Sequence, residues 1–91
     1  GAKGDYNREL EYYLKALAIR EKVLGEENPY TARSYNNIGD VYDEKNDYAQ
    51  ALEYYYKALA IWEKVLGEEH PSTLMVKDNI SLILQRQSGN E

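Results

Sequence analysis

The chain has 91 residues, 43% of them hydrophobic and 30% charged, which suffices for one small domain with a modest core. Its net charge of −5 argues against nucleic acid as a partner, because nucleic-acid-binding domains usually carry a basic patch. The absence of cysteine excludes disulfides, thiol chemistry and thiolate metal sites. No apolar run comes close to about 18 residues, the length that a transmembrane helix requires.

The first predicted element is a helix over residues 5–25. Its sequence has a near-copy downstream at a constant offset of 42 residues, and about 22 of 34 aligned positions are identical. Self-similarity at a period of this length is typical of solenoids and other repeat arrays.

The second element is a helix from Pro29 to about Asp43, because Asn28 can cap it and Pro29 fits its first turn. Its buried stripe follows helical spacing and consists of Tyr35, Ile38, Gly39 and Tyr42. Gly39 allows a second helix to approach closely. A polar turn, residues 44–47, ends this element.

The third element is a longer helix, from Tyr48 to Leu66, which Asp47 can cap and Gly67 can end. It contains three consecutive tyrosines, Tyr54–Tyr56, which cannot all face one core because a helix turns about 100° per residue. We expect Tyr55 in the core and Tyr54 at the edge of the next repeat.

A last helix is predicted over residues 71–87, beginning at Pro71. It is apolar nearly all round, which predicts burial on more than one side.

We call the first helix of each period helix A and the second helix B, so that the four helices follow the order B-A-B-A. Short loops between them imply antiparallel neighbours.

One period resembles the tetratricopeptide repeat pattern at Tyr35, Ile38, Gly39, Tyr42, Ala51, Tyr55 and Ala58. The 42-residue length, with "SYNNIGDVY" and "DYAQALEYYYKALAI", resembles the kinesin-light-chain-like branch of that family. The resemblance covers about residues 5–84. It implies an all-α fold of antiparallel helix-turn-helix repeats, stacked as a short right-handed superhelix (an α-solenoid), that binds peptides or partner proteins without catalysis or cofactor.

We therefore expect a single tetratricopeptide-like domain over residues 1–91. Residues 5–25 would be an orphan helix B, residues 29–66 a complete repeat, and residues 71–87 a terminal helix A. The last helix departs from the pattern, since Lys77, Ser81 and Leu84 replace Tyr35, Gly39 and Tyr42.

The resemblance places the A helices on the concave face, where ligands bind, and predicts a groove lined by Arg33, Asn36, Asn37, Asp40, Asp43, Met75, Asp78 and Leu82. Asn36–Asn37 resembles the paired asparagines of the kinesin-light-chain-like branch, and an asparagine can both donate to and accept from a peptide backbone. The acidic side chains predict a neutral or basic peptide. The alternative is that Asn37, repeated at Asn79, only maintains the fold and that the acids form a solvated face.

Nothing in the sequence points to catalysis. His70 precedes Pro71 as Asn28 precedes Pro29, which favours a cap or loop role. The repeated acidic pairs, Glu26–Glu27 and Glu68–Glu69, have no base or nucleophile beside them and are interpreted as structural or solubilising. We expect no enzyme activity, cofactor, metal site, nucleic-acid partner or membrane segment, and a cytoplasmic location.

The competing hypothesis is a structural or engineered repeat that self-assembles without a natural ligand. The first helix B lacks a helix A before it, and the last helix A lacks a helix B after it. One molecule could dock on the next through these complementary ends as a homo-oligomer, either head to tail or as a two-fold dimer.

Overall fold

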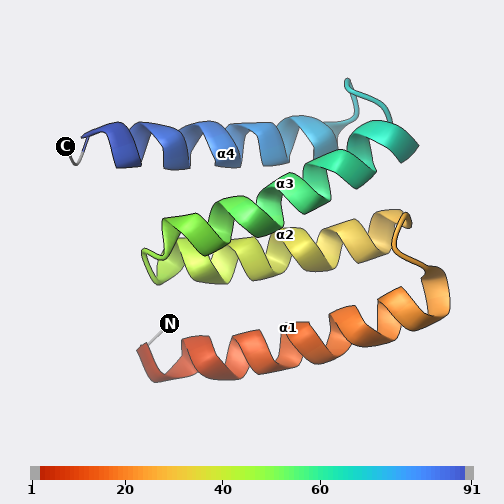
Figure 1. Cartoon of the computed structure of the whole chain (residues 1–91), viewed down its shortest axis with the longest axis horizontal. Coiled ribbons are helices and arrows are strands. Elements are labelled where there is room, and N and C mark those ends of the chain that lie inside the picture. The colour runs from red at the N-terminus through yellow and green to blue at the C-terminus, as the bar shows by residue number, and fades with distance from the viewer. Residues whose placement is uncertain (1–2, 90–91) are drawn as a thin grey trace.

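The computed structural model describes residues 3–89, which form four helices and no strand. These are α1 (Lys3–Leu24), α2 (Pro29–Glu44), α3 (Tyr48–Val65) and α4 (Pro71–Gly89). Successive helices run antiparallel and lie side by side in chain order (Figure 1), with α2 and α3 packed most extensively. The predicted all-α fold with the order B-A-B-A is confirmed.

Polar side chains cap the helices as the sequence predicts. Asn28 Oδ1 accepts the backbone N–H of Tyr30 at 2.9 Å, and His70 Nδ1 accepts that of Ser72 at 3.1 Å. Asp47 accepts the N–H three residues onward at 3.3 Å. The caps of α2 and α4 therefore occupy equivalent positions of the repeat, with histidine doing in one what asparagine does in the other.

Each of the two loops that connect a helix B to the following helix A contains an equivalent threonine hydrogen bond in addition to the cap. Thr31 Oγ1 donates to the carbonyl of Gly25, and Thr73 Oγ1 donates to that of Gly67, each at 2.8 Å. Both threonines are fully buried, and both glycines have left-handed φ angles, 88° and 92°. The loop conformation is thus repeated along with the helices.

The core divides into two clusters. The larger one joins α2, α3 and α4 through Ala32, Ala51, Tyr55, Ala58, Trp62, Val76, Ile80 and Ile83. The smaller one, which we call the α1–α2 cluster, consists of Leu10, Leu17, Ile38 and Val41. The aromatic rings of Tyr35 and Tyr42 pack against both clusters.

The tyrosine run on α3 serves three environments. Tyr55 is 1% exposed in the larger cluster, as predicted, and Tyr56 is 48% exposed. The expectation that Tyr54 covers the next repeat is wrong. Tyr54 packs against the α1–α2 cluster and stacks on Tyr42, with ring centroids 5.7 Å apart, because its position on α3 faces the preceding helices.

The expectation that α4 is buried on more than one side is also wrong. Its covered face carries Thr73, Val76, Ile80 and Ile83 against α3. The other large apolar side chains are 44–48% exposed: Leu74, Met75, Leu82 and Leu84. In Figure 1, α4 forms one edge of the stack, with α3 on its inner side.

Candidate functional site

A pocket of about 330 Å³ lies between the two A helices, α2 and α4. Its lining is Arg33, Asn36, Asn37 and Asp40 from α2, Trp62 from α3, and Pro71, Ser72 and Met75 from α4. We call it the α2–α4 pocket. It brings together five residues that the sequence placed in a groove, namely Arg33, Asn36, Asn37, Asp40 and Met75.

The other three predicted groove residues lie outside this pocket. Asp43 is paired with Arg86 of α4, with Arg86 Nη1 2.8 Å from Asp43 Oδ1. Asp78 and Leu82 are exposed on α4. The Asp43–Arg86 pair connects the two A helices and reduces the negative charge beside the pocket.

The two asparagines differ in their surroundings. Asn36 is only 5% exposed, and its Oδ1 lies 3.5 Å from the donating Nδ2 of Asn79 on α4. Asn37 is half-buried in the pocket lining. Asn79 is the counterpart of Asn37 one period later, so the asparagine repeated along the chain here contacts the neighbouring helix A.

Asp40 is held by the buried phenol of Tyr55. The Tyr55 hydroxyl donates to Asp40 Oδ1 at 2.6 Å. Burial raises the pKa of the Asp40 carboxyl above its ordinary 3.8, the Tyr55 hydrogen bond opposes this, and the nearby charges of Asp43 and Glu44 add to it. Burial, followed by the bond to Asp40, raises the pKa of the Tyr55 phenol far above its ordinary range.

Comparison with known proteins adds one match. The family model described as "Tetratricopeptide repeat" matches residues 2–64 and residues 45–91. The chain belongs to the tetratricopeptide repeat family. A search of the curated proteins gave no match. Tetratricopeptide repeats generally mediate protein–protein interaction and form a non-enzymatic scaffold family.

Three residues that line the pocket were not assigned to a site from the sequence: Pro71, Ser72 and Trp62. Of these, Trp62 belongs to the core. It is 2% exposed, and its indole Nε1 donates to the carbonyl of Pro29 at 3.1 Å. Sequence reasoning placed it on the core stripe, which is correct, but its edge also reaches the pocket. The signal was the replacement of Trp62 by Arg20 in the other copy, one of only two differences between residues 10–27 and 52–69.

The described part of the repeat, residues 3–89, holds no group of three or more histidine, aspartate or glutamate side chains placed to bind a metal ion. Within the same residues, no helix has the length and apolar character needed to cross a bilayer. The α2–α4 pocket presents hydrogen-bonding groups, one carboxylate (Asp40) and one guanidinium (Arg33). The apolar part of its lining consists of Trp62, Pro71 and Met75.

Proposed function

We propose that this chain is a protein-interaction module that binds an extended peptide segment of a partner in the α2–α4 pocket. The observation that carries the proposal is the convergence of five predicted groove residues from two helices on one pocket. Its volume, about 330 Å³, lies at the lower end of the range for ligand pockets. It suits one or two side chains of a peptide rather than a whole folded partner.

The proposed roles follow from the contacts. Asn37, half-buried in the pocket lining, would pair with the peptide backbone because its amide both donates and accepts. Asn36, which is almost fully buried against Asn79, would keep the two A helices in register. The side chains of Met75 and Trp62 would contact an apolar side chain of the ligand.

The charge of the site favours a neutral or basic peptide. Asp40 supplies a half-buried carboxylate, which a Lys or Arg side chain can neutralise. Arg33 adds a positive charge in the same lining, so the preferred ligand carries an isolated basic residue rather than a basic run. The Asn36–Asn37 pair is one of the features behind the kinesin-light-chain-like resemblance, and membership of that branch remains a prediction.

A peptide-library screen against the full chain, followed by calorimetric titration of the best ligands, tests this function. Asn37→Ala and Asp40→Asn should each weaken binding at least fivefold, and Asp40→Asn most for peptides with a basic residue. Asp5→Asn and Asn7→Ala, on exposed positions of α1, are the matched controls. If no peptide binds, or if both pocket variants bind like the controls, the proposal is wrong.

Self-association through the terminal helices is the second candidate. It is favoured by apolar side chains left open at both edges of the stack: Tyr12 and Val23 on α1 are 70% and 72% exposed, and Leu74 and Leu84 on α4 are each 45% exposed. Sedimentation of the full chain over a concentration series tests it. A monomer at high micromolar concentration would exclude it.

A further inference from the structure

The α2–α4 pocket contains two side chains of opposite charge that are held apart from each other. Arg33 lines it near the start of α2, and Asp40 lines it seven residues later. Seven residues are about two helical turns, so both side chains project from the same side of α2, at positions about 10.5 Å apart along its axis. Among the residues that the structure describes, neither side chain belongs to an ion pair.

The surrounding side chains leave these two charges available to a ligand. Asp43, which lies one turn beyond Asp40, is paired with Arg86 of α4. Tyr55 donates a hydrogen bond to Oδ1 of Asp40, which fixes the carboxylate and leaves Oδ2 for a ligand. Arg33 is exposed. The pocket therefore presents a fixed carboxylate at one end and an accessible guanidinium at the other.

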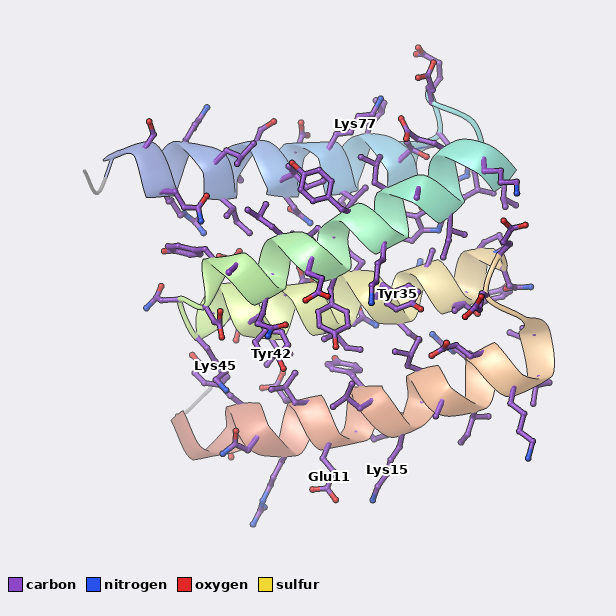
Figure 2. The ribbon with its side chains drawn as sticks, in the orientation of Figure 1. Glu11, Lys15, Tyr35, Tyr42, Lys45 and Lys77 are labelled. Carbon is purple, nitrogen blue, oxygen red and sulfur yellow. The ribbon has the colours of Figure 1, made fainter. Side chains whose placement is uncertain are left out.

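The lysines labelled in Figure 2 lie away from the pocket. Lys15 projects from the outer edge of the stack, Lys45 lies at the turn between α2 and α3, and Lys77 is paired with an acidic residue of α3 at 3.7 Å. An acidic residue of a ligand in the pocket would therefore meet Arg33, which is the basic residue of the lining.

We propose that the ligand of this pocket is a segment in the polyproline II conformation that carries one basic and one acidic residue three positions apart, in either order. The inference rests on the proposed function, because it specifies the peptide that the pocket binds. The basic residue pairs with Asp40 and the acidic residue with Arg33. In a polyproline II segment, residues three apart lie on the same side and about 9 Å apart, close to the spacing of the two side chains on α2. In a β-strand, residues three apart point to opposite sides.

A second, smaller pocket continues the site past Arg33. It has a volume of about 160 Å³, and it shares Arg33, Trp62 and Ser72 with the α2–α4 pocket. The rest of its lining is Pro29, Tyr30 and Leu66, which suits one aliphatic side chain. Because this pocket adjoins Arg33 and not Asp40, we expect the aliphatic residue beside the acidic residue of the ligand, on the side away from the basic one.

The two opposite charges also select against peptides of uniform charge. A run of basic residues would place one of them beside Arg33, and a run of acidic residues would place one beside Asp40. Either contact is repulsive, which is a common source of specificity in binding sites. The net charge of −5 would by itself attract any basic peptide, so the position of Arg33 restricts a choice that the overall charge leaves broad.

Two labelled seven-residue peptides, capped at both ends, are the probes. One has lysine second, glutamate fifth and leucine sixth, and the other has leucine first, glutamate second and lysine fifth; alanine and proline fill the remaining positions. Fluorescence anisotropy follows their titration with the full chain at low salt. We expect at least one probe to bind saturably. Replacing its glutamate by glutamine, or moving the glutamate by one position in either direction, should weaken binding at least threefold.

Variants of the chain assign each charge of the probe to its partner. With Arg33→Gln, the probe and its glutamine analogue should bind equally, whereas Arg8→Gln, at an exposed position of α1, should preserve the difference between them. Arg33→Glu should bind a peptide with lysine at both charged positions at least threefold more tightly than the wild type does, a gain that misfolding cannot produce. Tyr30→Ala should weaken binding of the probe but not of an analogue with alanine in place of leucine.

Three results would overturn the inference and leave the proposed function intact. One is equal binding of the glutamate probe and its glutamine analogue. Another is equal binding at all three spacings of the charged residues. The third is no saturable binding of either probe, while the peptide library yields other ligands that depend on Asn37 and Asp40. If the library also yields no ligand, the proposed function fails together with the inference.

Discussion

Tyr55 of α3 meets α2 at two successive residues: its ring lies against the bare Cα of Gly39, and its hydroxyl donates to Asp40 at 2.6 Å. One side chain thus fixes both the distance between the two helices and their register. Because Asp40 also lines the α2–α4 pocket, the same contact positions the carboxylate that we propose receives the ligand's basic residue.

Removing the phenol hydroxyl should destabilise the fold. We expect Tyr55→Phe to lower the free energy of unfolding by about 1.5–3 kcal/mol at neutral pH, the usual range for a hydrogen bond to a charged group. The loss should shrink in acid, where Asp40 is protonated and the bond is between neutral groups. Urea unfolding at both pH values measures this. An equal loss at the two pH values would show that packing, and not the bond to a carboxylate, is responsible.

Asp40 should make the fold less stable as pH rises. Since burial raises its folded-state pKa above 3.8, the folded chain holds this proton more tightly than the unfolded chain. The corresponding stability is fully present below 3.8 and is lost as pH rises through the folded-state pKa. Asp40→Asn removes this titration. The difference in unfolding free energy between this variant and the wild type should grow from acid to neutral pH, and a difference that stays constant would contradict the prediction.

A methyl group at position 39 should be costly. Gly39→Ala places a Cβ 2.6 Å from the Tyr55 ring, and the packed core leaves this ring little room to move. Overpacking of this kind costs about 1–3 kcal/mol. Gly89→Ala is the matched control, because no atom lies within 4 Å of its added Cβ. Thermal unfolding should separate the two variants, and similar melting temperatures would contradict the close contact.

The buried phenols should make the protein sensitive to alkali. Burial is the largest cause that raises the pKa of Tyr35, Tyr54 and Tyr55 above 10.0. Their contribution to stability is complete below pH 10 and is lost as pH rises further, because the unfolded chain ionises first. The phenolate absorbance of these three tyrosines should therefore appear together with the loss of helical circular dichroism. Complete ionisation of all tyrosines with the helices intact would contradict this.

The histidine cap of α4 should be replaceable by asparagine but not by alanine. His70→Ala removes the acceptor for the Ser72 N–H and should cost about 0.5–2 kcal/mol. His70→Asn should restore most of this loss, since Asn28 performs the same task in the other copy. Glu69→Ala, at the exposed neighbouring position, is the control. If alanine and asparagine at position 70 gave equal stability, the cap would be without consequence.

Local chemistry explains why the helices could be predicted. Caps such as Asn28 and Asp47 act within three residues. Because the sequence is duplicated, the same signals for the start and end of a helix occur in both copies. The neighbours of Tyr54 and of α4 could not be predicted, because they depend on which helix lies on which side. The buried hydrogen bonds of Thr31 and Thr73 join residues only six apart but depend on the folded path of the loop, and they were also not predicted, although the recurrence of threonine at both positions was visible in the sequence.

The candidate site was only partly accessible to the same reasoning. The family resemblance, combined with the turn angle of one helix, identified the side of α2 that carries Arg33, Asn36 and Asp40. It did not find that Trp62 contributes from α3 or that Asn36 is buried against Asn79, because these depend on how closely two helices approach. The pairing of Asp43 with Arg86 also spans two helices, 43 residues apart in sequence.

The packing of each helix chiefly on its neighbours in the chain has a kinetic consequence. Nearly all stabilising contacts can be lost from one end without breaking those at the other, so the native state should open by fraying rather than as a unit. Amide hydrogens of α2 and α3, which have helices on both sides, should exchange with solvent last, and those of the edge helices α1 and α4 first. A peptide bound between α2 and α4 would move that gradient, slowing exchange in α4, which would otherwise be among the first helices to open.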